Sequence, residues 1–401
     1  MDSLHYLIQK SLSNSNKNLE ILPKFFSKDE HRILSQRSVS IVGTNGKTTT
    51  ATILNEILSQ QGLKSVLFTS PHLVKLNERI QINQKSIEDL ELDEGMQRVM
   101  LFEEENNIVL GYFESIFLIA TKYFLNHDFE VFIAEAGIGG RLDTTSILNS
   151  QTVCLTNIGF DHTELLGETL EEILYEKILI SKNVRNFIVG SKKVDKDYKF
   201  LIKEALQIED DHYFSGFKKN NSKDLINDIS KSFIKSNQET AFETSKVFLS
   251  NLKQYDNLKK NSELSFDVNL IKPDGRFQVI KELPELKIID GAHNPSGIEA
   301  FFELLDQSYN LEKIDCYIGF NQNKDFGEML KVIWMRDNLN IKILEDKTFF
   351  KQLESVTLEK HFISNNQDFS KSTLKEFHFA KKPSILLGSL YLVGEYIKEY
   401  K

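Results

Sequence analysis

The fold of this chain is decided by residues 40–50, which are Ser-Ile-Val-Gly-Thr-Asn-Gly-Lys-Thr-Thr-Thr. Apolar and β-branched residues lead into a glycine-containing turn, and a helix-forming run, Ala-Thr-Ile-Leu-Asn-Glu-Ile-Leu, follows at residues 51–58. This order predicts a strand, a loop and the N-terminus of a helix. Such a loop directs consecutive backbone N–H groups and the positive end of the helix dipole toward one point, which suits a phosphate chain.

The side chains of this phosphate loop, residues 43–48, add groups that a nucleotide requires. Lys47 supplies a point charge for the outer phosphates, and the Thr48 hydroxyl can ligate Mg²⁺. The full motif has a further glycine where Ile41 stands, so the pattern is only partly matched. Taken alone, the stretch leaves a second interpretation open, a glycine-rich turn between a strand and a helix.

Length and composition describe an ordinary globular protein with room for two domains. The 401 residues are 40% hydrophobic and 27% charged. A net charge of −9 argues against a nucleic-acid partner, because a surface that tracks phosphates is normally basic. The two cysteines, Cys154 and Cys316, stand within apolar runs, which predicts buried thiols in a reducing compartment.

The sequence shows no targeting or membrane signal. Residues 1–5 lack a basic segment followed by an apolar core, so a secretory signal is not expected. No apolar run approaches the length that spans a bilayer. We therefore expect a cytoplasmic protein without a membrane partner. Nothing in the sequence demands an oligomer, and we expect a monomer that acts on small molecules.

Three predicted strands end near polar side chains, namely Ser70, Glu135 and His162. These strands are expected at residues 64–69, 130–134 and 152–159. Parallel strands have their carboxyl ends at the edge that also carries the phosphate loop, so we expect these side chains to lie together. Oxygen ligands and one imidazole suit Mg²⁺ held beside nucleotide phosphates.

Helices are expected between these strands and in the N-terminal segment. Helical spacing of apolar residues is found at Leu4, Leu7, Ile8 and Leu12. Further helices are expected at residues 86–106, 114–124, 168–182 and 238–252. Lys177 lies in the middle of the helix at 168–182. Its spacing alone favours a surface lysine paired with a nearby glutamate.

A second α/β pattern begins after a turn at residues 272–277, Lys-Pro-Asp-Gly-Arg-Phe. Strands are expected at residues 287–290, 315–319, 341–344 and 384–387, with a last helix at 390–400. We assign residues 1–265 to a nucleotide-binding domain, 266–286 to a linker and 287–401 to a C-terminal domain. The predicted fold class is α/β: an N-terminal phosphate-loop domain with a mainly parallel sheet, and a smaller Rossmann-like domain.

Motifs over nearly the whole chain resemble the folylpolyglutamate synthase/dihydrofolate synthase branch of the Mur ligase superfamily. Members of that superfamily are ATP-dependent enzymes that join a carboxylate to an amino acid, and their nucleotide loop is similar to residues 43–48. The other matching blocks occur in the family's order and are residues 69–73, 78–80, 137–143, 157–167, 176–177, 275–276, 290–295 and 388–391. The resemblance implies the Mur ligase architecture.

The resemblance also implies roles for individual residues. The ATP-binding residues would be Gly43, Thr44, Asn45, Gly46, Lys47, Thr48, Arg276 and Asp290. The Mg²⁺ ligands, for what we expect to be two ions, would be Thr48, Ser70, Glu135, His162 and Lys177, the lysine as a carbamate formed with CO₂. The catalytic residues would be Lys47, His162, Lys177 and His293. Phe113, Glu114, Leu142, Asp143 and Thr144 match segments that contact the folate or its pterin.

The implied reaction transfers the γ-phosphate of ATP to a carboxylate. The carboxylate would be that of 7,8-dihydropteroate or the terminal γ-carboxylate of tetrahydrofolate, and the resulting acyl phosphate would be attacked by the amine of L-glutamate. Two alternatives stay open: a Mur-type ligase for another γ-glutamyl or peptide acceptor, and a non-catalytic ATP-binding homologue with a regulatory role.

The chain departs from the family pattern at three places. The folate branch has Gly-Ser after the loop lysine. This chain has Thr48 and Thr49 at those two positions, which is closer to the cell-wall ligases. The asparagine expected to contact adenine is missing, because Ala241 occupies its position. The N-terminal segment lacks the family's pterin-side signature, which belongs to the dihydrofolate synthase activity and not to the ATP chemistry.

Overall fold

The computed structural model describes residue 10 and residues 19–217, 233–252, 273–320, 326–345, 355–365 and 367–401. The expected N-terminal helix with Leu4, Leu7, Ile8 and Leu12 lies outside these ranges. The chain divides into two compact units. The first is built mainly from residues up to Ile271 and the second mainly from Lys272–Lys401. Strand β9 (Gln278–Lys281) lies within the segment predicted as a linker.

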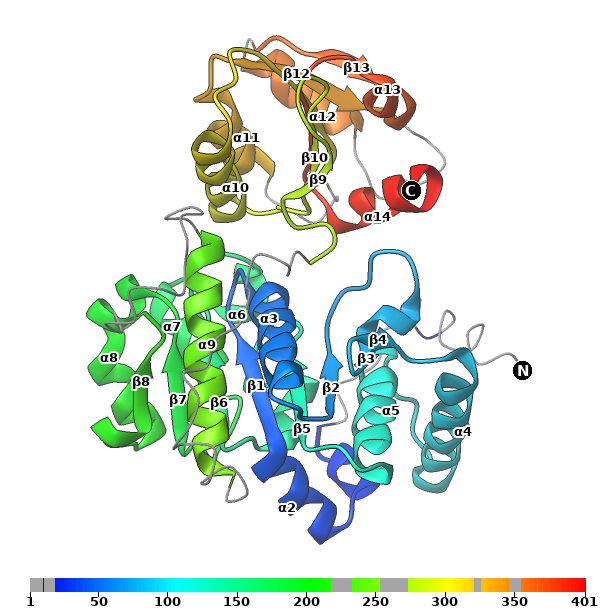
Figure 1. The fold of residues 1–401 in the computed structure, drawn as a ribbon, viewed down its shortest axis with the longest axis vertical. Coiled ribbons are helices and arrows are strands. Elements are labelled where there is room, and N and C mark those ends of the chain that lie inside the picture. The colour runs from blue at the N-terminus through cyan, green and yellow to red at the C-terminus, as the bar shows by residue number, and fades with distance from the viewer. Residues whose placement is uncertain are drawn as a thin grey trace. The chain divides into compact units, whose positions relative to one another are not determined.

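A sheet of eight described strands forms the centre of the first unit (Figure 1). Its spatial order is β4-β3-β2-β5-β1-β6-β7-β8. The strands are β1 Ser38–Val42, β2 Ser65–Phe68, β3 Ile80–Ile82, β4 Lys85–Ser86, β5 Val131–Glu135, β6 Thr152–Leu155, β7 Asn186–Val189 and β8 Tyr213–Ser215. Neighbours are parallel from β2 to β8, and only the β2–β3 and β3–β4 pairs are antiparallel. The phosphate-loop strand β1 therefore lies between β5 and β6.

Helices cover both faces of the central part of this sheet, so strands β1, β2, β5, β6 and β7 are buried along their whole length. The α-helices are α2 Lys28–Arg37, α3 Lys47–Gln60, α4 Asp89–Asn106, α5 Tyr112–Asn126, α6 Thr163–Leu166, α7 Leu170–Ile178, α8 Lys192–Leu206 and α9 Phe233–Asn251. Short 3₁₀ helices are η1 Leu22–Phe25, η2 Leu76–Arg79, η3 Thr144–Leu148 and η4 Asp210–His212. Along β5, Val131 and Ile133 pack with α3 and α9, whereas Phe132 and Ala134 pack with α5. This alternation gives three layers.

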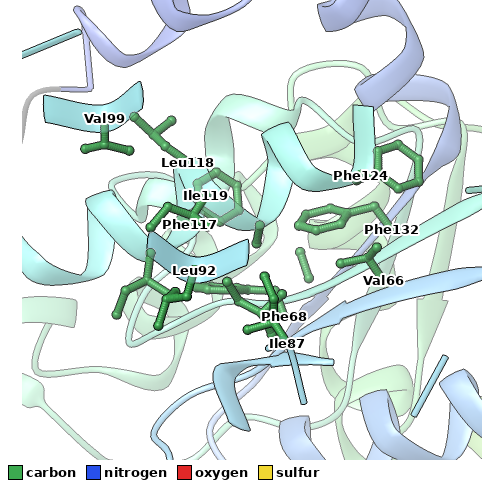
Figure 2. Close-up of a cluster of buried hydrophobic side chains, with 14 of the residues drawn as sticks. Val66, Phe68, Ile87, Leu92, Val99, Phe117, Leu118, Ile119, Phe124 and Phe132 are labelled. Atoms are coloured by element: carbon green, nitrogen blue, oxygen red, sulfur yellow. The ribbon is translucent and has the colours of Figure 1, made fainter. Parts of the chain in front are cut away.

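The core between α5, α4 and the sheet contains many aromatic side chains (Figure 2). The Phe117 ring on α5 packs edge to face against Phe68 at 5.3 Å between centroids and against Phe132 at 6.2 Å. Glu114 fixes the start of α5, because its Oε2 accepts a hydrogen bond from the Gly111 backbone N–H at 2.6 Å. The Glu114 carboxylate is therefore buried and used to cap its own helix.

The second unit has its own six-stranded sheet among the described residues, in the order β13-β12-β11-β14-β10-β9. Its remaining strands are β10 Lys287–Ile289, β11 Ile314–Ile318, β12 Leu339–Leu344, β13 Ser370–Ser372 and β14 Ser384–Leu387. Its helices are α10 Pro295–Ser308, α11 Phe326–Trp334, α12 Ser355–Ser364, α13 Leu374–Phe379 and α14 Leu390–Tyr400. All neighbouring strands are parallel except β9 and β10.

The predicted fold class is confirmed: both units are α/β, and the larger sheet is mainly parallel. Two predicted element boundaries were wrong. The strand expected at residues 152–159 ends at Leu155, and the helix expected at 168–182 spans Leu170–Ile178. Strands β7 and β8 and helix α8 were not predicted. Strand β7 is buried along its whole length, so it shows no alternation of apolar and polar residues.

The expectation from the two cysteines agrees with the structure. Cys154 and Cys316 are buried free thiols, and burial raises the pKa of Cys154 to about 12, so neither an exposed nor a reactive thiolate is present at these positions. Within the described part of the chain, none of the helices has the length and apolar character needed to cross a bilayer.

Replacement of Phe117 tests the core of the first unit. Because this side chain is fully buried, Phe117→Ala should lower the free energy of unfolding of that unit by about 3–5 kcal/mol. Phe200→Ala is the control, since Phe200 is 88% exposed and its truncation should cost less than about 0.5 kcal/mol. Urea unfolding followed by circular dichroism measures both, and equal midpoints for the two variants would contradict the assigned core.

Candidate active site

The phosphate loop connects the end of β1 to the start of α3. Gly43 has φ +149° and Gly46 has φ +81°, both in the region that favours glycine. A Cβ on Gly43 would lie 2.0 Å from the Thr156 Oγ1, so the loop also approaches the segment after β6 too closely for a side chain. Glycine is required here for both backbone conformation and space.

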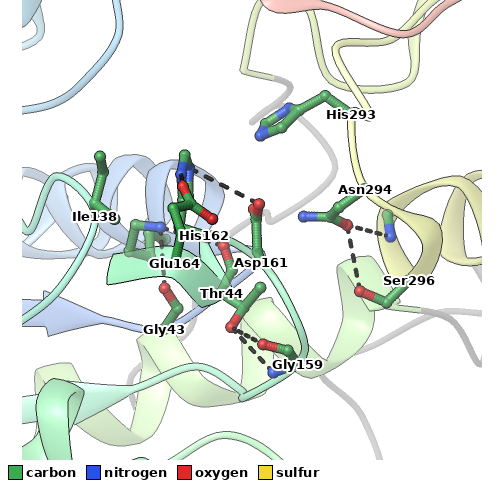
Figure 3. Close-up of polar contacts among 12 residues, drawn as sticks. Gly43, Thr44, Ile138, Gly159, Asp161, His162, Glu164, His293, Asn294 and Ser296 are labelled. Carbon is green, nitrogen blue, oxygen red and sulfur yellow. Dashed lines mark hydrogen bonds and ion pairs between the residues drawn. The ribbon is translucent and has the colours of Figure 1, made fainter. Parts of the chain in front are cut away.

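The segment after β6 holds the phosphate loop by several hydrogen bonds. The Thr44 N–H donates to the Asn157 carbonyl oxygen at 3.1 Å, and the Asn45 N–H donates to Asn157 Oδ1 at 2.9 Å. The Gly159 N–H donates to Thr44 Oγ1 at 3.0 Å (Figure 3). Lys47 turns back along the loop, and its Nζ donates to the Gly43 carbonyl oxygen at 3.0 Å. Hydrogen bonds therefore hold the backbone of the loop in one conformation.

The carboxylate of Glu135, which is 2% exposed, connects the loop helix to the next strand. Its Oε1 accepts a hydrogen bond from Thr48 Oγ1 at 2.8 Å, and its Oε2 accepts one from the Ser70 N–H at 3.1 Å. The strand order β2-β5-β1 explains the meeting, because all three strands are parallel and end at one edge. Carboxylate and hydroxyl oxygens at this place suit Mg²⁺.

Lys177 on α7 is buried at 2% exposure, so the surface position favoured by its spacing was wrong. Its Nζ donates to the Gly43 carbonyl oxygen at 3.0 Å and to the Ile138 carbonyl oxygen at 2.9 Å (Figure 3). No carboxylate in the described ranges forms an ion pair with it. Burial, together with the charge of Lys47, lowers the pKa of the Lys177 amine to about 7. Its neighbour Glu176 pairs with Arg141 instead.

His162 lies beyond the end of β6, as the N-cap residue of α6, with φ +50°. A non-glycine residue in this left-handed region is uncommon, and such residues cluster at functional sites. Its Nε2 lies 3.8 Å from Asp161 Oδ1 and its Nδ1 lies 3.6 Å from Glu164 Oε1 (Figure 3). Across the described ranges, three or more His, Cys, Asp or Glu residues nowhere gather as a metal site. A cation site here would therefore need other oxygen donors, such as the Thr48 hydroxyl, beside the Glu135 carboxylate.

The segments assigned to the substrate lie together around Gly137. The Gly137 N–H donates to Asp143 Oδ2 at 3.0 Å, and a Cβ on Gly137 would lie 3.3 Å from the Phe113 ring. Asp143 Oδ1 also accepts from the Thr145 N–H, and Thr144 is buried beside it. Leu142 is 49% exposed. The Asp143 carboxylate thus stabilises the loop at residues 137–145, whereas the exposed part of Leu142 offers apolar surface.

One residue of this site was missed by the sequence analysis. Ala241, at the position expected for asparagine, is fully buried in the core under α9. Asn237 lies one helical turn earlier, and its Oδ1 accepts a hydrogen bond from Thr50 Oγ1 at 3.3 Å. A Cβ on Gly46 would lie 2.4 Å from that same Oδ1. The i−4 spacing on one helix face was the signal that could have identified Asn237.

In the second unit, the predicted ATP residues lie at the carboxyl end of β10. Asp290 Oδ2 accepts from the Phe277 N–H and Oδ1 accepts from the Ala292 N–H, both at 2.6 Å. Desolvation raises the pKa of Asp290, and the charge of Arg276 opposes that rise. The His293 Nδ1 lies 2.7 Å from the Gly291 carbonyl oxygen. Asn294 caps α10, because its Oδ1 accepts a hydrogen bond from the Gly297 N–H at 2.8 Å. Figure 3 shows its contact with Ser296.

Together, the parallel sheet, the phosphate loop and a second α/β unit define an α/β protein of the phosphate-loop class. Residues 41–264 match the model of the Mur ligase middle domain, which is more than half of the chain. The chain belongs to the Mur ligase family.

Several characterised proteins are similar to it over nearly their full length. The dihydrofolate synthase/folylpolyglutamate synthase of Buchnera aphidicola from Schizaphis graminum is 28% identical, with 94% of this chain and 95% of the relative covered. The protein of the same name from Bacillus subtilis is 26% identical, with 91% and 90% covered.

Solved structures show the same fold. The bifunctional folylpolyglutamate synthase/dihydrofolate synthase of Yersinia pestis, also solved with AMPPNP and Mn, superposes with a TM-score of 0.78 at 22% identity, covering 99% of this chain and 98% of that one. An Escherichia coli structure in complex with DHPP and ADP superposes with a TM-score of 0.78 at 21% identity, covering 99% and 97%.

Gly140 tests whether the position of Lys177 matters. A Cβ on Gly140 would lie 2.3 Å from the Lys177 carbonyl oxygen and 2.5 Å from the Glu176 carbonyl oxygen, so Gly140→Ala must displace α7. We expect phosphate release from ATP to fall at least about tenfold, the effect of misplacing a catalytic group. Gly139→Ala is the matched control, because its nearest contact would be a side-chain oxygen at 3.1 Å. Equal activity of both variants would argue against a role for the α7 position.

Proposed function

We propose that this protein is an ATP-dependent ligase that adds L-glutamate to 7,8-dihydropteroate, to the γ-carboxylate of tetrahydrofolate, or to both. The observation that carries the proposal is the Glu135 carboxylate, held between Thr48 and Ser70 beside the phosphate loop. It occurs in a chain of the Mur ligase family whose relatives carry the names dihydrofolate synthase and folylpolyglutamate synthase. One solved relative, with a TM-score of 0.79, has Mn, AMPPNP and L-glutamate bound.

In the first step, the acceptor carboxylate attacks the γ-phosphorus of ATP. The bond from that phosphorus to the bridging oxygen breaks, and ADP leaves with its electron pair. Backbone N–H groups of residues 43–48 and the Lys47 ammonium bind the phosphates and stabilise the charge that spreads over the transferring group. Asn157 and Gly159 keep the loop in shape during this step through the contacts already described.

In the second step, the amine of L-glutamate attacks the carbonyl carbon of the acyl phosphate. The amide bond forms, inorganic phosphate leaves, and the amine loses a proton. No covalent bond to the protein is required. From the second unit, we assign Arg276 and Asp290 to ATP and His293 to the neighbourhood of the transferred phosphate, on the resemblance of residues 275–276 and 290–295 to the family.

Two magnesium ions fit the donor groups of this chain. Thr48, Ser70, Glu135 and His162 would hold Mg²⁺, with Lys177 added as a carbamate, and the ions would neutralise the phosphate charge. The buried Glu135 carboxylate lies between hydroxyl-bearing residues, which is the donor set that a hard cation prefers. Phe113, Glu114, Leu142, Asp143 and Thr144 would form the wall for the folate or pteroate acceptor.

Lys177 is suited to carbamylation by its surroundings. It is buried, it contacts carbonyl oxygens, and its lowered pKa leaves a large neutral fraction near pH 7. A neutral amine attacks CO₂, loses a proton and becomes an anionic carbamate, which adds an oxygen ligand at the site.

We further assign the protein to the cytoplasm as a monomer that binds small-molecule substrates.

Acceptor-dependent ADP release tests the function. Purified protein with Mg-ATP and L-glutamate should release ADP when 7,8-dihydropteroate or tetrahydrofolate is added, and Glu135→Gln should lose about a hundredfold of this rate. Turnover with both acceptors would establish a bifunctional enzyme, and turnover with one would name the activity present. ATP binding without turnover on either acceptor would contradict the folate assignment and favour another acceptor or a non-catalytic homologue.

Removal of CO₂ tests the carbamate. In CO₂-free buffer the ligase rate should fall, and bicarbonate should restore it, more completely above pH 7 than below because protonation of Lys177 removes the nucleophilic amine. With ¹³C-bicarbonate, a carbamate resonance should appear in the unaltered protein and in Lys182→Ala, whose side chain is exposed. The resonance should vanish in Lys177→Ala; its persistence there would contradict the assignment.

A further inference from the structure

A buried arginine lies beside the candidate active site and has no part in the chemistry assigned above. Arg79, at the end of η2, is 6% exposed. Its Nε donates a hydrogen bond to His72 Nδ1 at 2.9 Å. Its guanidinium lies over the Tyr112 ring, 5.1 Å from the centroid, as in cation–π pairs. We call His72, Arg79 and Tyr112 the Arg79 cluster.

The hydrogen bond from Arg79 sets the tautomer of His72. A ring nitrogen that accepts a hydrogen bond carries no proton, so the proton of this neutral imidazole is on Nε2. The side chain of His72 is only partly buried. Within the described ranges no group accepts a hydrogen bond from its Nε2, so the cluster presents a fixed N–H donor. The charges that act on this imidazole are the Arg79 guanidinium, which holds its Nδ1, and the Glu78 carboxylate.

The Arg79 cluster adjoins both parts of the site. His72 follows Ser70 by two residues, and the Ser70 N–H donates to the Glu135 carboxylate. Tyr112 precedes Phe113, whose ring packs against Phe68 at 5.4 Å between centroids. The cluster therefore lies near the place where the acceptor carboxylate is activated and near the wall assigned to the acceptor's ring system.

A donor backed by a guanidinium is a recognition site for a carboxylate. Among the acceptors of the proposed function, pteroate compounds have a single carboxylate, which is the reacting one. Folate compounds end in glutamate, so they carry an additional α-carboxylate close to the reacting γ-carboxylate. A group that binds an anion next to the reacting carboxylate could therefore bind the α-carboxylate of a folate. A pteroate has no second carboxylate for it to bind.

We propose that the Arg79 cluster binds the α-carboxylate of the terminal glutamate of a folate acceptor, with His72 Nε2–H as the donor and Arg79 as its positioning residue. This inference rests on the proposed function. It makes the cluster a specificity determinant that favours folate acceptors over pteroate acceptors.

Binding of a matched pair of ligands tests the proposal. 7,8-Dihydrofolate and 7,8-dihydropteroate differ only by the glutamate, and their dissociation constants can be measured by calorimetry with Mg-AMPPNP present. His72→Phe keeps an aromatic ring and removes the donor. It should weaken dihydrofolate binding about tenfold or more relative to dihydropteroate, the usual effect of losing a hydrogen bond to a charged group. His72→Gln, whose amide N–H can replace Nε2–H, should restore most of the difference.

The controls distinguish a failure of the proposal for the Arg79 cluster from a failure of the proposed ligase function. AMPPNP affinity should be the same in all variants, which reports an intact phosphate loop. Arg79→Lys keeps the charge but not the Nε geometry and should lose the same selectivity as His72→Phe. Equal weakening of both ligands, or no change in either, would overturn the proposal, as would unaltered protein that binds dihydropteroate but not dihydrofolate. Failure of the unaltered protein to bind either ligand would instead overturn the proposed function.

Discussion

The geometry of the site in the first unit depends on the two hydrogen bonds that the Glu135 carboxylate accepts. It is almost fully buried, where an unpaired charge would be costly, and hydrogen bonds from Thr48 and Ser70 offset that cost. These partners come from the loop helix and from the segment after β2. They meet only because β5 lies between β1 and β2 in a parallel sheet. One carboxylate therefore joins three chain segments at one edge of the sheet.

The phosphate loop depends on a second set of neighbours on the other side of β1. Asn157 and Gly159 hold the loop through backbone and side-chain contacts, and Lys177 donates to the carbonyl oxygen of Gly43. Such contacts cost no reorganisation when a nucleotide arrives, so the loop can bind phosphates in the shape that it already has. The same packing that shapes the loop buries Lys177 and lowers its pKa, which links nucleotide binding to the chemistry of that amine.

The side of the site that we propose for the acceptor has a different character. Phe113 and Leu142 offer apolar surface, whereas Asp143 is used to hold its own loop by accepting backbone hydrogen bonds. Charge on this side comes from Arg79, which orients His72. A flat aromatic compound with an acidic tail matches this combination of apolar wall and anion-recognising group. The described part of the site thus divides into a phosphate region built on backbone N–H groups and an acceptor region built on side chains.

The sequence by itself determined the α/β class, the phosphate loop and the strands that end at Ser70 and Glu135, because these follow from local periodicity and glycine placement. Only the tertiary structure decided that β6 stops at Leu155, that Lys177 is buried, and that Asn237 lies against the loop. Burial of a lysine and the meeting of a helix with a distant loop depend on packing between segments far apart in the chain. No local pattern records that packing, so these features could not be predicted from the residues around them.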